Sequence, residues 1–383
     1  MVFFSAIFFF CLLMVAYVYV GYPVLALILS TINNRQVRKT RHWPTVSILI
    51  AAHNEENHIG TTIENKLALE YPRDKIEIIV ISDGSTDETD NIVSRYEQQG
   101  IRLLRQEPRA GKTSALNMAV RSARGEIIVF SDANSLYREN AIQKLVQNFS
   151  DDGVGYVTGK MVYTKPDGST VGDGCTAYMK YENFLRGVET RVGSIVGVDG
   201  GIDAVRKSLY RPMRQDQLPD FVLPLAVVKQ GFRVVYEPGA VLHEATLVSQ
   251  EDEYAMRVRV TLRALWALKD MKHMLNPCRY TTFAWQMWSH KVLRYLCIVF
   301  LAGLYFANAV LWLEGLGYRI FFLLQSCLYC LAFSSWNLEK KKYDLKKLFV
   351  LGYFVLINVA AFHALVKFLR GEKLAVWTPR KGM

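Results

Sequence analysis

The chain has 383 residues, more than one ordinary domain needs and enough for two. Hydrophobic residues make up 51% and charged residues 21%, which excludes a disordered or fibrous chain, and the six scattered cysteines give no disulfide framework. The formal net charge of +11 is compatible with nucleic acid, anionic lipid or an anionic small molecule, so the distribution of apolar residues has to decide between them.

A membrane-spanning helix is the first element that the sequence predicts, within residues 1–34. Residues 2–34 carry no charged side chain, and about 20 apolar residues are enough to cross the hydrocarbon core of a bilayer. A secretory signal peptide is the alternative, but the run is longer than such peptides, follows no basic segment and precedes no small-residue cleavage site. The basic residues that follow predict a cytoplasmic location from residue 35 onward; they are Arg35, Arg38, Lys39 and Arg41.

Residues 35–275 are predicted to form one domain in which strands and helices alternate. Short apolar runs predict buried strands at residues 46–52, 76–81, 101–104 and 126–130. Helices are expected between them, at residues 55–69, 85–99 and 110–124. This alternation is typical of an α/β fold with a mostly parallel sheet and helices on both faces. Ligands bind beyond the carboxyl ends of such strands, so the polar residues that follow each strand form the candidate site.

Asp132 and Asn134 close the fourth of these strands, and their side chains can share one divalent cation. Oxygen ligands of this kind suit Mg²⁺ and Mn²⁺, although Asp and Asn are also common in turns that bind nothing. Residues 111–113 resemble the end of a phosphate-binding loop, but Gln106 stands where that loop needs its first glycine. Lys112 is therefore expected to be a simple anion contact at the start of a helix.

Asp220 and a later group of residues each admit a structural and a functional interpretation. Asp220 precedes an apolar stretch, so it is either a helix cap or a general base. Arg259, Arg263 and Trp266 share one face of a predicted helix, because they are spaced at four and three residues. That face is either a solvated basic surface or a clamp on a diphosphate, to which Arg can donate two parallel hydrogen bonds.

The C-terminal part of the chain is predicted to return to the membrane. Residues 276–294 mix aromatic and basic side chains, which favours an amphipathic helix at the membrane interface over a buried linker helix. Residues 295–370 contain three uncharged runs, and two or three spans are expected there. These runs are residues 295–313, 320–338 and 348–366.

The number of C-terminal spans is left open by the charges around them. The basic loop at 340–347 and the basic tail at 371–383 both favour the cytoplasm. Four complete spans from an outside N-terminus would instead leave the tail outside. The last apolar run also contains Asn358 and His363, so the alternatives to a full span are that it lies in the interface or re-enters the membrane.

Several stretches together make the chain resemble membrane-integrated family 2 glycosyltransferases. That family includes synthases of cellulose, hyaluronan, chitin oligosaccharide and poly-N-acetylglucosamine. The resemblance covers residues 44–270, and the membrane segments on either side agree with it. The stretches that carry it are Ser47–Glu56, Ser82–Asp87, Gly111–Asn117, Ser131–Asn134, Gly200–Arg206 and Pro219–Pro224.

The resemblance implies a GT-A fold that binds a nucleotide-sugar donor, expected to be a UDP-sugar, together with Mg²⁺ or Mn²⁺. Glu55 and Asp83 would contact the nucleotide, with Lys112 nearby. Asp132 would contact the ribose or the diphosphate and share the metal ion with Asn134.

The resemblance also implies the chemistry of the transfer. Asp220 would be the catalytic base that takes the proton of the acceptor hydroxyl, in a single displacement that inverts the anomeric configuration. The leaving diphosphate gains charge, which nearby cations stabilise. Arg259, Arg263 and Trp266 would belong to this donor-binding side of the site.

Three departures from the family pattern bear on the product. Asn134 replaces the second acid of the Asp-x-Asp motif, which weakens the metal site, and Pro219 replaces the Glu that precedes the base. The Gln-x-x-Arg-Trp motif of processive synthases is reduced to its arginine within residues 256–260, and Trp266 follows in a different register. Processive synthesis is therefore less well supported than glycosyl transfer itself.

We therefore expect an integral protein of the bacterial plasma membrane with a cytoplasmic catalytic domain. The expected activity is transfer of a sugar to a growing cell-surface or extracellular polysaccharide. The alternative is addition of one sugar to a lipid-linked acceptor, and a nucleotide-binding membrane sensor or transporter subunit without turnover is the third hypothesis. The expected partners are the donor, a glycan or lipid-linked acceptor and membrane lipid, and not nucleic acid.

Overall fold

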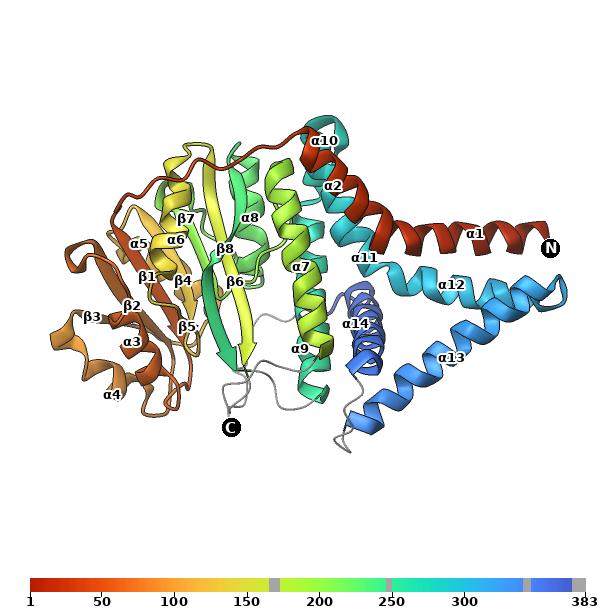
Figure 1. Cartoon of the computed structure of the whole chain (residues 1–383). Coiled ribbons are helices and arrows are strands. Elements are labelled where there is room, and N and C mark those ends of the chain that lie inside the picture. The colour runs from red at the N-terminus through yellow and green to blue at the C-terminus, as the bar shows by residue number, and fades with distance from the viewer. Residues whose placement is uncertain (165–172, 246–249, 340–345, 374–383) are drawn as a thin grey trace.

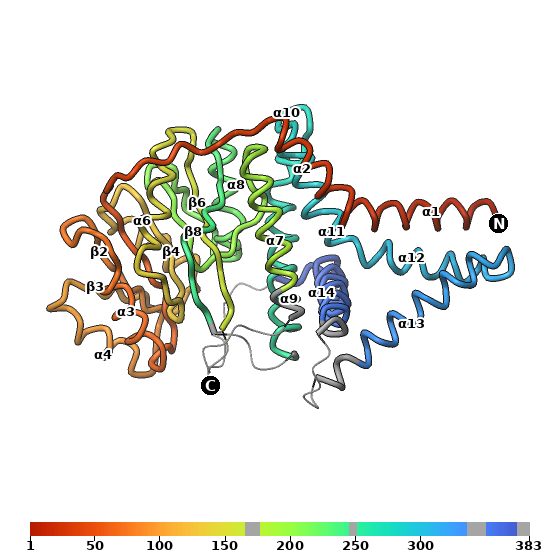
Figure 2. The backbone as a smooth tube through the Cα atoms, in the orientation of Figure 1, coloured from red at the N-terminus to blue at the C-terminus, as the bar shows by residue number. Residues whose placement is uncertain are grey.

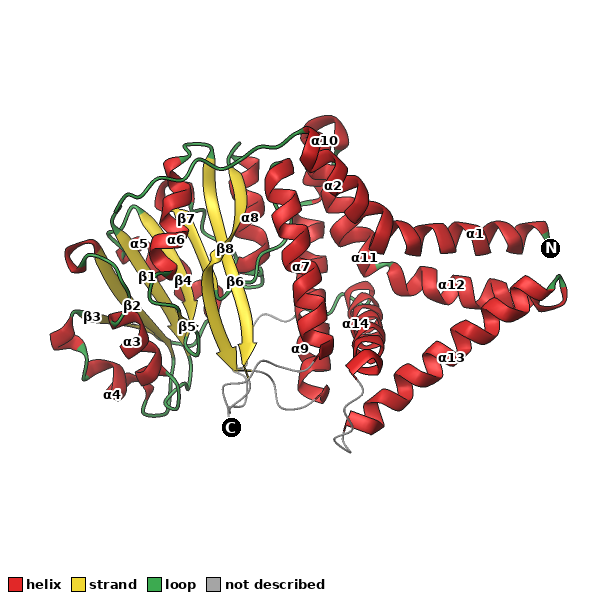
Figure 3. Cartoon of the chain, viewed as in Figure 1, coloured by secondary structure: helices red, strands yellow, loops and turns green. Residues whose placement is uncertain are grey.

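The computed structural model describes residues 1–164, 173–245, 250–339 and 346–373. A sheet domain occupies one side of the molecule, and long helices project from its other side (Figure 1). The strands of the described chain all lie in the sheet domain, whereas the projecting part is helical (Figure 3). Residues 340–345 and 374–383 lie outside the described residues, so the expectations for the basic loop and the tail stay predictions.

Within the described chain, eight strands form one sheet in the order β3-β2-β1-β4-β7-β6-β8-β5. Their bounds are Val46–Ala52 (β1), Ile76–Asp83 (β2), Ile101–Gln106 (β3), Ile127–Asp132 (β4), Leu136–Tyr137 (β5), Val154–Thr164 (β6), Ile202–Arg206 (β7) and Arg233–Ala245 (β8). The first four strands pair in parallel, as the sequence predicts, so their carboxyl ends meet at one edge. β7 runs antiparallel to β4 and β6, and β5 to β8, so the second half of the sheet is mixed and not mostly parallel.

Helices cover both faces of the sheet and enclose two apolar cores. The helices of the domain are α3 (Ile59–Leu67), α4 (Thr89–Ser94), α5 (Lys112–Ser122), α6 (Ala141–Val146), α7 (Asp173–Val192), α8 (Pro219–Lys229) and α9 (Gln250–Asp270). Every residue of the central strand β1 is buried, and its alternate residues face opposite cores. Ile48 joins the core beneath α3 and α6, and Leu49 joins the core beneath α5, α8 and α9.

Helices long and apolar enough to cross a membrane lie near both ends of the chain. The helices outside the sheet domain are α1 (Val2–Ala16), α2 (Tyr22–Ile32), α10 (Pro277–Met287), α11 (Leu293–Tyr295), α12 (Cys297–Val310), α13 (Leu316–Glu339) and α14 (Lys346–Leu369). The described residues contain three candidate spans, at Val2–Ile32, Leu316–Ser334 and Val350–Leu369. A fourth would arise only if α10 to α12 crossed the membrane together despite a bend of 57°.

The last candidate span stays close to the sheet domain. α14 lies against α7 and α9 of the domain and also contacts α13, whereas α1 and α12 pack together further from the sheet (Figure 1). Val258 and Leu262 of α9 pack on Ala360 and Ala364 of α14. α1 is held on α12 separately, by contacts of Phe8 with that helix.

The segment between α2 and β1 fastens the N-terminal helix to the domain. Residues 33–45 cross the top of the sheet domain before β1 begins (Figure 2). The Arg38 guanidinium donates to the carbonyl oxygen of Ser150 at 2.9 Å from Nε. Lys39 Nζ lies 2.6 Å from a carboxylate oxygen of the buried Glu237. Part of the basic cluster that predicts membrane orientation therefore also serves in folding.

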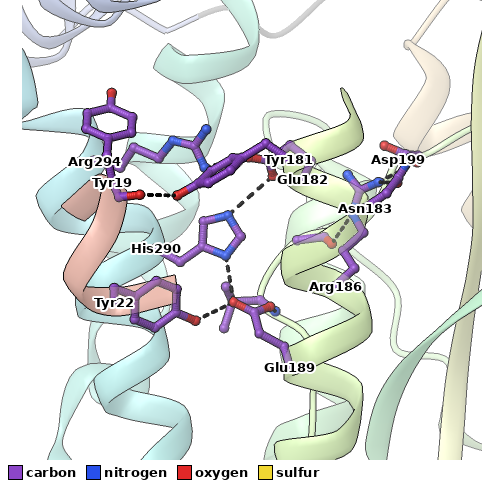
Figure 4. A network of polar contacts seen from close by, with 12 residues as sticks. Tyr19, Tyr22, Tyr181, Glu182, Asn183, Arg186, Glu189, Asp199, His290 and Arg294 are labelled. Atoms are coloured by element: carbon purple, nitrogen blue, oxygen red, sulfur yellow. Dashed lines mark hydrogen bonds and ion pairs between the residues drawn. The ribbon is translucent and has the colours of Figure 1, made fainter. Parts of the chain in front are cut away.

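A network of buried charged side chains joins the projecting helices to the domain (Figure 4). Glu189 of α7 accepts hydrogen bonds from the hydroxyl of Tyr22 in α2 and from the backbone N–H of Val196. Its Oε1 also lies 2.7 Å from Nδ1 of His290, in the π-helical segment Trp288–Val292 between α10 and α11. A buried carboxylate needs such partners, because the loss of its hydration is costly.

The same network continues along α7 toward the sheet. Glu182 lies 3.3 Å from Nε2 of His290 and 2.5 Å from Nη1 of Arg294. Arg186, one turn further along α7, forms a 2.6 Å ion pair with Asp199, and both side chains are buried. Asp199 lies just before β7, so the network extends from α2 to the edge of the candidate site.

Candidate active site

Polar residues gather where β1, β2 and β4 end, as expected from the parallel pairing. His53 follows β1, and its Nδ1 lies 2.8 Å from the carbonyl oxygen of Asp83 at the end of β2. Asn54 adopts a positive φ of 54°, and its side-chain oxygen accepts a 2.8 Å hydrogen bond from the backbone N–H of Thr86. These contacts fix the two strand ends side by side and place the half-buried Glu55 at the rim.

Asp83 is buried, and both oxygens of its carboxylate accept hydrogen bonds from the segment that leads into α5. Oδ1 accepts hydrogen bonds from Gln106 at 2.5 Å and from the backbone N–H of Ala110 at 2.8 Å. Oδ2 accepts from the backbone N–H of Gly111 at 2.8 Å. The Asp83 carboxylate therefore holds the backbone directly before Lys112, at the start of α5. The expected contact of Asp83 with a nucleotide stays a prediction.

Lys112 begins α5 and carries the positive charge of the site. Its Nζ forms an ion pair with Asp132 at the end of β4, a contact not predicted from the sequence. Burial lowers the pKa of Lys112, but the carboxylates of Asp132 and Asp220 outweigh it and hold the pKa above its usual range. Lys112 therefore stays protonated between two acids from separate elements.

Asp220 is the second residue of α8, and it reaches the same group of charges. Burial raises the pKa of Asp220, Lys112 lowers it and Asp132 raises it, with a net rise above the ordinary value. A carboxylate with a raised pKa suits a general base better than an exposed one. The structure shows Asp220 within the first turn of the helix, where no side-chain cap bond forms.

Gly200 makes the room that Asp220 occupies. A Cβ atom at position 200 would lie 2.5 Å from Oδ2 of Asp220, and the backbone there has a φ of +90°. Both conditions require glycine. The family stretch that begins at Gly200 is therefore explained by its contact with Asp220, although the two are 20 positions apart.

The arginines of α9 lie beside this group, and Trp266 does not. Arg263 Nη2 donates to the carbonyl oxygen of Gln217 at 2.8 Å, while its buried Nε has no hydrogen-bond partner among the described residues. Arg263 interacts electrostatically with Asp220 and with the half-buried Arg259. Trp266 instead packs on Phe368 of α14, and no contact within the described chain joins it to Asp132 or Asp220. Its expected contact with the donor stays a prediction.

The oxygen ligands at the end of β4 fit a divalent cation. Asp132 and Asn134 are both partly exposed at the strand end, and the Asn134 side chain has no hydrogen bond to any described residue. The described residues contain no group of three His, Cys, Asp or Glu side chains that could hold a metal ion. A cation here would therefore take most of its ligands from water and from the phosphates of a donor, as Mg²⁺ usually does.

Asp203 is a functional candidate that the sequence interpretation missed. It lies in the middle of β7 inside the stretch Gly200–Arg206, and it is almost fully buried. Its charge interacts with Asp220 and Lys112. The signal in the sequence was an acid between apolar residues of a five-residue strand.

The whole fold has a counterpart among solved structures. The mannosyltransferase PcManGT from Pyrobaculum calidifontis, solved with GDP-Man and Mn²⁺, superposes with a TM-score of 0.73 over 96% of this chain and 99% of that chain, at 21% identity. This likeness and the strand order define a GT-A fold. Residues 47–210 match the family described as glycosyl transferase family 2, so the chain contains a family 2 glycosyltransferase domain.

Curated relatives share this region but differ in their products. A beta-monoglucosyldiacylglycerol synthase of Nostoc is 32% identical over 43% of this chain and 36% of its own length. A poly-beta-1,6-N-acetyl-D-glucosamine synthase of Staphylococcus aureus is 28% identical over 50% of this chain and 48% of its own. The chain thus spans about half or less of the length of the relatives that it matches.

Proposed function

We propose that the chain is an inverting glycosyltransferase that uses a nucleotide-sugar donor, most simply a UDP-sugar. The observation that carries the proposal is the position of Lys112 between Asp132 and Asp220, at the carboxyl edge of the parallel strands. Phosphate groups of a donor would meet a fixed cation there, and the acceptor would meet a base with a raised pKa.

The transfer requires one bond to form and one to break. Asp220 takes the proton of the acceptor hydroxyl while that oxygen attacks the anomeric carbon. The bond from this carbon to the diphosphate oxygen breaks at the same time, which inverts the configuration. Lys112 and the unpaired Nε of Arg263 stabilise the charge that develops on the diphosphate. A Mg²⁺ or Mn²⁺ ion held by Asp132 and Asn134 would add to this stabilisation.

The acceptor is proposed to be a growing polysaccharide at the cytoplasmic face of a bacterial plasma membrane. The candidate spans and the basic residues after α2 support the membrane location and the orientation. The polysaccharide synthase among the relatives supports the product, and the glucosyldiacylglycerol synthase supports transfer of a single sugar to a lipid as the alternative.

Incubation of the purified protein with a panel of labelled nucleotide sugars tests the function. We expect one donor to give nucleoside diphosphate release together with a labelled product. Long products support the polysaccharide, whereas a product with one added sugar supports the lipid acceptor. Absence of release with every donor would contradict glycosyl transfer and favour a binding protein without turnover.

Removal of divalent cations is expected to stop the reaction. Because the described residues contain no group of three metal-ligating side chains and the proposed ligands are Asp132 and Asn134, EDTA should strip the ion readily and reduce turnover to background. Mg²⁺ or Mn²⁺ added in excess should restore the initial rate. Undiminished turnover in EDTA would show that Lys112 and the arginines suffice without a metal.

A methyl group at position 200 is expected to displace the base. Gly200→Ala should reduce turnover by about 100-fold, because the new Cβ would overlap Asp220 and a shift of about 1 Å is enough to misplace a reacting group. Gly193→Ala is the matched control, since a Cβ there would meet nothing within 4 Å. Equal turnover of the two variants, measured as nucleoside diphosphate release, would mean that Asp220 does not need its present position.

A further inference from the structure

Asp203 is a buried acid that the proposed mechanism does not use. Asp203 is 1% exposed, and its carboxylate oxygens form no hydrogen bond of ordinary geometry within the described part of the chain. The hydroxyls of Thr158 and Tyr156 interact with the carboxyl and lower its pKa, but burial outweighs them. It lies on β7 opposite Phe130 of β4 on one side and Thr158 of β6 on the other. An ionised carboxylate in such a place is very unfavourable, whereas a neutral acid is tolerated.

The groups around Asp203 belong to the site described above. Phe130 lies in the same core as Tyr156 and α8, so Asp203 faces the side of the sheet that carries Lys112 and Asp220. The titratable groups around it come from five elements. They are Tyr137 of β5, Tyr156 of β6, Lys112 of α5, Asp220 of α8 and Asp199 before β7.

Asp203 and Asp220 differ in environment, so their protons are held differently. Burial raises the pKa of Asp203 to about 7, and the charge of Asp220 adds to this rise. Asp220 is closer to the cations, because both Lys112 and Arg263 lower its pKa. Two nearby acids whose environments separate their pKa values take different roles, one holding the proton and the other the charge.

We propose that Asp203 is a positioning residue for the transfer: it remains a neutral acid beneath Asp220, so that Asp220 is the ionised carboxylate that accepts the acceptor proton. The inference rests on the proposed function. Ionisation of Asp203 would place a further negative charge beside Asp220 and Asp132. That charge would repel the anionic donor and would hold the proton on Asp220 more firmly after transfer.

The first test measures the proton on Asp203 without any substrate. A carboxyl whose pKa is higher in the folded than in the unfolded state destabilises the fold as pH rises between the two values. As the pH rises from about 4 to about 7, the melting temperature of the wild type should therefore fall relative to that of Asp203→Asn. The difference between the two melting temperatures should stop changing above the pKa of Asp203 in the folded state. A difference that stays constant with pH would overturn the proposal.

A second variant keeps Asp203 and removes its charged neighbour. In Asp220→Asn the charge that raises the pKa of Asp203 is absent, so the pH-dependent loss of stability should end at a lower pH than in the wild type. An unchanged midpoint would show that the two acids are not coupled. This measurement remains decisive even if Asp203→Asn does not fold.

The last test measures the role in turnover. Wild-type kcat/KM, with the donor found in the panel, should decline as pH rises through about 7, and Asp203→Asn should retain its activity there. Parallel pH profiles would reduce Asp203 to a structural residue. If no donor supports turnover, the proposed function fails, while the melting experiments still report whether Asp203 carries the proton.

Discussion

Replacement of Asp220 by asparagine is expected to lower turnover by about 100- to 10,000-fold, the usual contribution of a general base. Asparagine keeps the size of the side chain, so Gly200 still accommodates it, but it cannot take the acceptor proton. In the proposed mechanism the donor would be held mainly by Lys112, Arg263 and the strand-end residues. Donor affinity, measured by titration calorimetry, should therefore change only a few-fold.

Two comparisons make this result specific to the base. Asp74→Asn makes the same chemical change at an exposed carboxylate before β2 and should keep wild-type turnover. The melting temperature of Asp220→Asn, measured beside turnover, separates loss of the base from loss of the fold. If Asp220→Asn turned over at the wild-type rate, Asp220 could not be the catalytic base.

Replacement of Glu189 by glutamine is expected to have the largest effect on stability. Glu189 is fully buried and bonds with Tyr22 of α2, Val196 and His290, so it joins both groups of projecting helices to α7 (Figure 4). The amide nitrogen of glutamine would face a donor in place of one carboxylate oxygen. Loss of one partner from a buried charge network costs about 3–5 kcal/mol, which is a large part of the stability of a typical domain.

Thermal unfolding in one detergent measures this effect. Glu189→Gln should lower the melting temperature clearly, and Glu107→Gln is the matched control. Glu107 is paired with Arg105 at 2.6 Å, but its side chain is 61% exposed, and such surface pairs contribute little. Equal melting temperatures of the two variants would mean that the network does not hold the projecting helices to the domain.

The parallel half of the fold could be predicted because its signals are local. Each of its strands is a short apolar run that ends in polar residues, and parallel pairing brings those ends together wherever the helices lie. The ion pair of Lys112 with Asp132 depends in addition on where the loop after β3 places the start of α5. Helix boundaries depend on local contacts: α4 covers only Thr89–Ser94 of the helix expected at residues 85–99, and Ser85 bonds with Ser82 before it.

The remaining features depend on contacts between distant segments. Strands β6 to β8 also alternate with helices, namely α7 and α8, but β7 runs antiparallel to β4 and β6, so the order and direction of these strands could not be read from the alternation in the sequence. The burial of Asp203 and the contact of Gly200 with Asp220 arise only when β7 and α8 meet. Trp266 could equally have faced the acids, and its contact with Phe368 depends on where α14 packs.

The anomeric configuration of the bond in the product tests the central claim most directly. A single displacement with Asp220 as the base requires that the new glycosidic bond have the configuration opposite to that of the sugar in the donor. NMR of the product formed from a donor of known configuration would show this in the coupling of the anomeric proton. We expect inversion; a product that retains the donor configuration would contradict the proposed role of Asp220.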